Sequence, residues 1–416
     1  METGLFFEHI RGRHETSMTK ALIVRLIEAH SRLVERKRNC DIRVTSQKGL
    51  VPILGRQECA WQAIEMPPME QPFRPAPAEA PIFDTSRNAW ILSRYSDVCT
   101  ALREHSLLQA TPQGKPTSPD AGAAHARLYA EVQADMSRLN ATTWRAEMES
   151  VLHSLLGKVD RNHSFDLVKE VLQPWSATLM VVLSEAGSVE AGQLRRIAEQ
   201  LFFKKTHTAG PSKTNPGLSS FSRKFTPQSS KKAEATLNAL LESRKLTLSK
   251  PMFSGLTQTL PSFLANAWLA LLQNPDQVAR LIENPALMPS ATEELLRHAG
   301  IVQTIFRHAS KDVNISDASI KQGQLVILKI ASANHDSARF DKPECLDVSR
   351  RFGGHVSLGN GVHACVGSVL VRMACMATTP IFLSAGLALD RKSAPAWTGN
   401  TTLRWPFVVP VILQRK

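Results

Sequence analysis

The sequence predicts a mostly α-helical protein with a minor β region. Long stretches place apolar residues at the three- and four-residue spacing of an amphipathic helix, notably residues 141–203 and "FLANAWLALLQNPDQVARLIENP" (263–285). Short runs that alternate apolar and polar residues, which is typical of strands, gather in residues 301–331. Hydrophobic residues make up 43% of the 416 positions, which is enough to bury a large core.

The first 60 residues are expected to form an N-terminal extension, partly helical or disordered, ahead of a single domain over residues 61–416. Within the extension, "TKALIVRLIEAHSRLVERKR" (19–38) has helical periodicity but mixes acidic and basic residues. This mixture favours a solvated helix over a membrane anchor or a transit peptide. The proline-rich residues 65–81 should be extended.

Turn signals and periodicity predict the succession of elements in the rest of the domain. Residues 89–105 predict a short strand followed by a helix. Residues 206–230 contain Ser, Thr, Gly and Pro but no acidic residue, and such a long loop is typically a lid or a disordered segment. Helical patterns return in residues 231–246 and in "SVLVRMACMATTPIFLSAG" (368–386).

Charge and cysteine usage narrow the class of partner and compartment. Lysine and arginine outnumber aspartate and glutamate by 50 to 37, which favours an acidic partner. No nucleic-acid motif is present, and aromatic residues are only 6%. No apolar run approaches the ~20 residues that span a bilayer. The six cysteines are scattered without a CxxC pair, so we expect a reducing compartment, the cytoplasm, and no disulfide framework.

The stretch "LGNGVHACVG" (358–367) places one cysteine in a glycine-rich loop. Glycines such as Gly361 and Gly367 allow positive φ and close approach of the backbone to a flat ligand. The apolar helix expected just after Cys365 would lower the pKa of its thiol through the helix N-terminus. Taken alone, the pattern fits a nucleophile, a metal ligand or a buried structural cysteine.

A second motif, "EELLR", places Glu294 and Arg297 three residues apart on one helix face. On a surface such a pair contributes only ~0–1 kcal/mol. The pair gains importance only if a third group holds it in the interior.

The motifs together resemble the cytochrome P-450 superfamily of haem-thiolate monooxygenases, of the bacterial soluble type. "EELLR", "ANHDSARFDKPECLDVSR" and "HVSLGNGVHACVG" follow one another in the order and spacing of that family's C-terminal half. "APIFDTSRNAWILSRYSDVCTAL" looks like its N-terminal strand and helix, and "APAWTGNTTLRWPFVVPVIL" looks like its closing strands. The resemblance covers roughly residues 80–414 and implies the family's triangular helical prism.

The resemblance implies that Cys365 is the axial thiolate ligand of the iron of haem (heme b), where the thiolate favours O–O cleavage. It also implies that Glu294 and Arg297 form a buried triad with Arg350, which would brace the cysteine loop.

Further positions match the family's partners for the haem propionates. His363 matches the basic position two residues before the cysteine, and Arg307 in "VQTIFRHA" matches another propionate partner. "HARLYAEV" resembles the family's helix motif, so His125 is carried over as a cofactor-binding residue, although Tyr129 replaces the arginine often found four residues later. His355 matches a common histidine before the loop, and a structural histidine is an equally good reading.

The chain departs from the family at two places. The aromatic residue that normally shields the sulfur is Leu358. In the oxygen-activating helix, "SGLTQTL" places Thr259 at the alcohol position but Gln258 at the acid position, and Leu256 and Pro261 also break the pattern. Glutamine cannot titrate, although it can order a water. A packing role for Thr259 is an even alternative to the catalytic one.

We therefore expect a cytoplasmic, monomeric monooxygenase that oxidises an apolar small molecule, such as a terpenoid or another secondary metabolite. Electrons would come from an acidic ferredoxin or a flavodoxin with its reductase. Substrate walls are expected from residues 104–124, 206–230, 253–260 and 301–306.

Three other readings stay open. Because of Gln258, the protein could use peroxide or catalyse coupling or dehydration. It could be a non-enzymatic haem ligand sensor. A cysteine-nucleophile hydrolase would need His363 as its base, and two residues apart in a turn is poor geometry for that role.

Overall fold

The computed structural model describes a defined part of the chain, and all of it lies in a compact unit that runs from Met66 to Lys416. The described residues are 75–117, 121–138, 141–160, 163–183, 193, 197, 249–351, 354–398 and 402–413. The predicted extension (1–60), the predicted loop (206–230) and the predicted helix (231–246) lie outside the described residues.

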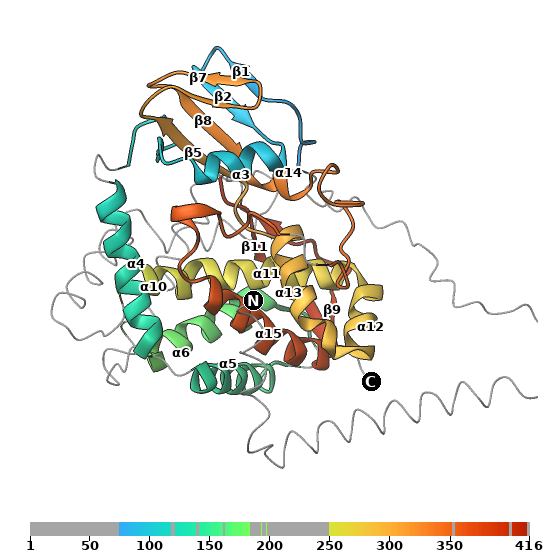
Figure 1. Cartoon of the computed structure of the whole chain (residues 1–416). Helices are drawn as coiled ribbons and strands as arrows, with labels where there is room; N and C mark the ends of the chain where they lie inside the picture. Colours follow the sequence, from blue (N-terminus) through green and yellow to red (C-terminus); the bar gives the residue numbers. More distant parts are fainter. Residues whose placement is uncertain are drawn as a thin grey trace, which may run out of the picture. The chain divides into compact units, whose positions relative to one another are not determined.

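The prediction of a mostly helical fold with small sheets is confirmed (Figure 1). The α-helices are α3 (Tyr95–Arg103), α4 (Ala121–Arg138), α5 (Ala141–Leu156), α6 (Gln173–Leu183), α10 (Lys250–Ser254), α11 (Leu260–Gln273), α12 (Pro275–Glu283), α13 (Met288–His298), α14 (Ile330–Asn334) and α15 (Ser368–Ser384). Short π- or 3₁₀-helical turns are η2 (Val168–Leu172), η3 (Gly255–Thr259), η4 (Pro285–Leu287) and η5 (Gly361–His363).

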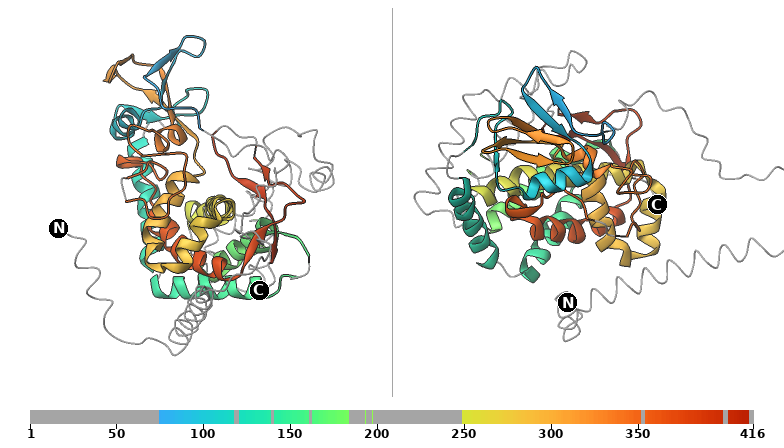
Figure 2. Two further views of the ribbon diagram at one scale, coloured as in Figure 1. Left: turned by 90° about the vertical axis from the view of Figure 1, so that its right-hand side faces the viewer. Right: turned by 45° about the horizontal axis from the view of Figure 1, so that its top comes forward.

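A five-stranded sheet lies to one side of the helices (Figures 1 and 2). Its strands, in spatial order, are β1 (Ile82–Asp84), β2 (Ala89–Leu92), β8 (Leu325–Lys329), β5 (Thr304–Ala309) and β3 (Leu107–Gln109). The β2–β8 pair is parallel and the other pairs are antiparallel, so the sheet joins the two halves of the chain.

Smaller sheets complete the β region. They are β6 (Val313–Ile315) with β7 (Ala318–Ile320), β10 (Ala396–Trp397) with β11 (Pro406–Val408), and β12 (Pro410–Leu413) between β4 (Phe165–Asp166) and β9 (Leu387–Leu389). The strand-then-helix expectation for residues 89–105 and the strands expected in 301–331 are confirmed.

Helix α11 runs through the middle of the helices and contacts α13 and α15 (Figure 1). Every residue from Leu260 to Leu271 is buried, as expected of a helix that is apolar on all sides. The Trp268 ring stacks on Phe382 of α15 at a centroid distance of 4.4 Å. This core fixes the helices that border the functional site.

The helical pattern predicted for residues 141–203 is confirmed within the described residues by α5, η2 and α6, and strand β4 separates α5 from the other two. Helix α5 ends at Leu156, and Gly157 follows it. The Asp166 carboxylate then accepts hydrogen bonds from the backbone N–H groups of Val168 and Val409, at 3.0 Å each. A pairing with the distant strand β12 thus outweighs the local helical periodicity at this point.

None of the helices in the described residues is long and apolar enough to cross a membrane.

Candidate functional site

A cavity of about 510 Å³ lies between the cysteine loop, the start of α11 and the five-stranded sheet. Its walls are mostly apolar, with residues from α3, η3, α11, β5 and the cysteine loop. The bordering residues on which the site depends are Thr259, Phe263, Val302, Ile305, Phe306, Arg307, Leu358, His363, Cys365 and Leu403. This volume is in the usual range for small-molecule sites.

The cysteine loop turns from η5 into α15, which begins three residues after Cys365. The backbone N–H of Cys365 donates to the Leu358 carbonyl at 2.7 Å and closes the loop. Gly361 has φ +81°, and a Cβ there would approach the Leu102 carbonyl oxygen of α3 to 2.9 Å. Only glycine allows both the positive φ and this close approach, so Gly361 lets the loop pack against α3.

The thiol of Cys365 opens into the cavity and is therefore solvent-accessible, although protein atoms surround it on the other sides. Burial raises the pKa of this thiol, while the backbone N–H of Gly367 and the charge of Arg372 act in the opposite direction. The prediction that the helix N-terminus lowers the pKa of the Cys365 thiol is therefore wrong for the protein without a ligand, because desolvation of the thiol outweighs the nearby dipoles and charge.

Arg307 on β5 brings a buried cation to the same cavity. The residue is only 6% exposed, and its guanidinium donates to the carbonyl of Phe306 at 3.1 Å. Among the described residues it has no carboxylate partner. Burial lowers its pKa to about 10, which reflects the cost of holding an unpaired charge away from water.

The π-turn η3 brings Thr259 to the cavity. The Thr259 hydroxyl donates to the Gly255 carbonyl at 3.1 Å. Gln258 does not border the cavity; it is buried, and its side-chain oxygen accepts from the Ser254 hydroxyl at 3.4 Å. Pro261 follows in the first turn of α11, where its missing N–H is tolerated.

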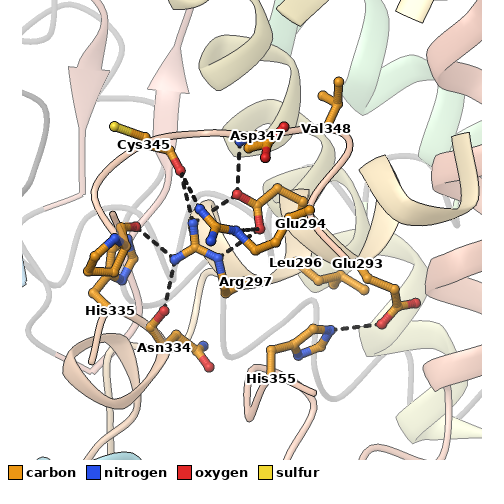
Figure 3. A network of polar contacts seen from close by, with 12 residues as sticks. Glu293, Glu294, Leu296, Arg297, Asn334, His335, Cys345, Asp347, Val348 and His355 are labelled. Atoms are coloured by element: carbon orange, nitrogen blue, oxygen red, sulfur yellow. Dashed lines mark hydrogen bonds and ion pairs between the residues drawn. The ribbon is translucent and has the colours of Figure 1, made fainter. Parts of the chain in front are cut away.

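Glu294 lies at the centre of a buried network on α13 (Figure 3). Its carboxylate accepts from Arg297 Nε and Nη2 at 2.8 and 2.9 Å, and from Arg350 Nε at 3.0 Å. The two arginines also donate to backbone carbonyls, namely those of Asn334, Asp341, Lys342, Pro343 and Cys345. These contacts hold residues 334–347, upstream of the cysteine loop.

The adjacent Glu293 points elsewhere and makes contacts that the sequence did not reveal (Figure 3). It accepts from His355 Nε2 at 3.1 Å and from Arg372 Nε at 2.5 Å. Its two partners lie on either side of the cysteine loop. The motif singled out only the second glutamate, Glu294, whereas the partners of Glu293 lie 62 and 79 positions away in the sequence.

The remaining predicted residues are placed as follows. His363 borders the cavity at the end of η5. Gly361 and Gly367 do not border it, and a Cβ at Gly367 would lie 3.9 Å from the Cys365 sulfur. His125 lies on α4, and its side chain is outside what the structure describes.

The expected walls from 104–124, 253–260 and 301–306 do contribute to the cavity, and the segment 206–230 lies outside the described residues. Sequence reasoning missed a contribution from Thr402 and Leu403 before β11.

These features fit the haem that the resemblance implies. A cysteine sulfur faces an apolar cavity, and a buried guanidinium that finds no carboxylate in the described part of the chain borders the same space. An anionic group of a ligand would satisfy that cation, and a flat apolar ring system suits the walls.

Comparison with known proteins agrees with this geometry. The cytochrome P450 family model matches residues 278–385. Cytochrome P450 107B1 of Saccharopolyspora erythraea is 27% identical over 77% of this chain and 86% of its own length. Beta-dihydromenaquinone-9 omega-hydroxylase of Mycobacterium bovis is 28% identical over 77% of this chain and 71% of its own length.

The solved structure of the LnmA cytochrome P450 hydroxylase of Streptomyces atroolivaceus matches with a TM-score of 0.64. It is 23% identical and covers 78% of this chain and 90% of that one. Fold, motif order and sequence similarity therefore agree on the cytochrome P450 family, whose model matches residues 278–385 and to whose bacterial members about three quarters of the chain is similar.

Proposed function

We propose that this chain binds heme b through the Cys365 thiolate and oxidises an apolar small molecule with O₂. The observation that carries the proposal is the convergence of three groups on one apolar cavity: the Cys365 sulfur, the buried Arg307 guanidinium, which has no carboxylate partner among the described residues, and the Thr259 hydroxyl. The family implies a haem-thiolate cofactor, and the residues that border the cavity are suited to it.

Each of these residues would have a separate task. Cys365 would supply the axial sulfur, while Arg307 and His363 would bind the propionates. His125 is a further candidate for that role from α4. Bound haem would supply the activation of O₂, which thiolate ligation favours.

Thr259 would position water-borne protons at the cavity. Its hydroxyl donates to the Gly255 carbonyl, so its lone pairs remain available to accept a hydrogen bond from a water in the cavity. Gln258 would act by fixing the π-turn through Ser254, because it does not border the cavity.

The substrate would be an apolar small molecule, such as a terpenoid or another secondary metabolite. Phe263, Val302, Ile305 and Leu403 offer aliphatic and aromatic surface without a buried charge. One relative is named for omega-hydroxylation of beta-dihydromenaquinone-9, and an apolar substrate of that kind is consistent with these walls.

The electron donor would be an acidic ferredoxin or a flavodoxin with its reductase. The chain carries a formal charge of +13, which would attract an acidic protein and speed its encounter. We further propose a cytoplasmic monomer with one catalytic domain over residues 61–416.

A second candidate function is turnover driven by hydrogen peroxide. The placement of Gln258 favours it, since the position held by an acid in the family carries a group that cannot titrate and does not border the cavity.

The test uses the purified haem-loaded protein and an apolar substrate that shifts its spin state. One reaction contains ¹⁸O₂, NADPH, ferredoxin and reductase, and the other contains hydrogen peroxide alone. We expect one ¹⁸O atom in the product of the first reaction. Product from hydrogen peroxide alone would favour the second function, and no product from either reaction would contradict both.

A further inference from the structure

Glu293 is the centre of a second polar network, separate from that of Glu294. Arg372 of α15 donates to both of its carboxylate oxygens, from Nε at 2.5 Å and from Nη2 at 3.0 Å. His355 donates from Nε2 at 3.1 Å. The two adjacent glutamates of α13 thus hold different parts of the chain (Figure 3).

The hydrogen bonds of His355 define its tautomer. The Glu293 carboxylate is ionised, since hydrogen bonds from His355 and Arg372 outweigh burial and hold its pKa at about 2. A carboxylate only accepts, so His355 Nε2 carries hydrogen. The backbone N–H of Ser357 donates to Nδ1 at 3.3 Å, so Nδ1 is an acceptor and the ring is neutral.

These contacts join α13 to both ends of the cysteine loop. His355 and Ser357 lie before Cys365, and the Ser357 hydroxyl also donates to the Leu296 carbonyl of α13. Arg372 lies seven residues after the cysteine, and its Nη1 also donates to the Ser368 carbonyl at the start of α15 at 3.5 Å. The Glu294 network holds the earlier residues 334–347 instead.

Arg372 also contributes charge at the ligand. Its guanidinium donates to the Ser368 carbonyl, and the Ser368 N–H donates to the Cys365 carbonyl at 3.2 Å, so its positive charge lies close to the ligand in the structure. Glu293 offsets that charge through a two-point ion pair. The Glu293 side chain is only 17% exposed and that of Arg372 32%, so solvent screens the pair incompletely.

We propose that Glu293, His355 and Arg372 are positioning residues for the cysteine ligand, and that the Glu293–Arg372 pair sets the positive charge at its sulfur. This inference rests on the proposed function, because it takes Cys365 as the haem ligand. His355 holds the start of the loop without adding charge. Arg372 holds the end of the loop and supplies a cation, and Glu293 determines how much of that charge reaches the sulfur.

The charge part of the proposal predicts opposite effects for the two partners. Reduction of the haem adds an electron next to the sulfur, so a nearby cation favours the reduced form. Arg372→Gln should therefore lower the midpoint potential. Glu293→Gln should raise it, because Arg372 is then uncompensated. The double variant should return close to the wild-type value, and Arg372→Lys should stay closer to wild type than Arg372→Gln.

The positioning part is tested by hydrogen exchange of the haem-loaded protein. His355→Gln should speed exchange of the backbone amides between residues 355 and 361 and leave the potential nearly unchanged. Lys321→Gln, which removes an exposed ion pair with Asp312, is the matched control and should change neither quantity.

The inference is overturned if both single variants shift the potential in the same direction or if neither shifts it. If a glutamine variant loses its haem, Arg372→Lys provides the test instead. Recovered haem content with a near-wild-type potential supports the charge role, whereas a loss of haem equal to that of Arg372→Gln contradicts it. The reduced carbon monoxide spectrum of the wild type separates the two proposals. Without its red-shifted thiolate band the proposed function fails, whereas unchanged potentials in a protein that shows the band defeat this inference alone.

Discussion

Arg307 is a buried cation whose guanidinium finds only a backbone carbonyl among the described residues. Such a charge destabilises the protein on its own and is stabilised by an anionic ligand. We expect Arg307→Met to leave the haem-free protein at least as stable as the wild type. Haem should dissociate roughly tenfold to a hundredfold faster, given ~1.5–3 kcal/mol for a hydrogen bond to a charged group.

The measurement is haem transfer to an acceptor apoprotein, together with thermal unfolding of the haem-free form. The conservative Arg307→Lys should give an intermediate rate. An unchanged rate of haem loss in Arg307→Met would show that this guanidinium does not bind the cofactor.

Thr259 carries the hydroxyl of the π-turn that borders the cavity. Thr259→Ala removes this group, so protons should be delivered less well and more of the reducing equivalents should be lost as hydrogen peroxide. Thr259→Ser keeps the hydroxyl and should stay close to wild type. Peroxide released per NADPH consumed measures the effect, and equal ratios in all three proteins would assign Thr259 to packing.

Sequence motifs identified the residues that lie in contiguous patterns. Cys365, His363 and Thr259 were named from such patterns, and all three border one cavity. Glu293 and Arg372 were missed, although Glu293 directly precedes Glu294 in the motif. Their contact spans 79 positions, and no local rule of spacing predicts which of two adjacent glutamates faces which arginine.

At the scale of the element, α13 depends on the ionised Glu294, which accepts four hydrogen bonds while it is about 2% exposed. Removing one partner of a buried ion network leaves uncompensated charge and costs about 3–5 kcal/mol. We expect Glu294→Ala to lower the free energy of unfolding by this amount and to reduce the haem content of the purified protein.

Urea unfolding and the ratio of haem to protein absorbance measure these two effects. Lys321→Ala breaks an ion pair whose side chains are about 60% exposed, so it should cost less than ~1 kcal/mol. Equal losses in the two variants would mean that burial of Glu294 confers no special stability.

Periodicity predicted which segments are helices, but it did not predict where the α-helical hydrogen-bond pattern changes to a π-helical one. The helix after residue 367 and the strands in 301–331 were expected and are present. The π-turn η3 was not expected. It is held by hydroxyl contacts that depend on the packed neighbours, such as the bond from Ser176 of α6 to the Leu256 carbonyl at 2.5 Å.

At the scale of the whole molecule, two neighbouring histidines make stability depend on pH. Burial lowers the pKa of His298 to about 3 and that of His335 to about 4. Repulsion between the two rings, and from Arg297, adds to the lowering for His298. The unfolded chain, with pKa values near 6.5, binds more protons than the folded chain in this range, so stability is complete above about pH 6.5 and falls as the pH decreases.

Proton uptake by each of these histidines in the unfolded chain should lower the free energy of unfolding by about 2 kcal/mol between pH 6.5 and pH 5. His298→Phe keeps an aromatic ring that does not titrate, so its unfolding free energy should fall less over this range. Denaturant unfolding at the two pH values measures this difference. Identical losses in the variant and the wild type would show that His298 is not the acid-sensitive group.

The overall fold was predictable because motifs from both halves of the chain keep a family order, and the parallel β2–β8 pair brings those halves together. The single domain over residues 61–416 remains a proposal. The cavity also needed the structure, since its walls come from α3, α11, β5 and the residues before β11, which are distant in sequence.

The central claim is that Cys365 holds haem iron through its thiolate. The most direct measurement is the absorption spectrum of the dithionite-reduced, carbon monoxide-treated protein, for the wild type, for Cys365→His and for the exposed-cysteine control Cys345→Ser. We expect the red-shifted Soret band of a thiolate-ligated haem in the wild type and in Cys345→Ser, and its loss in Cys365→His, because imidazole donates less charge than thiolate. A Cys365→His protein that binds haem and keeps this band would contradict the assignment.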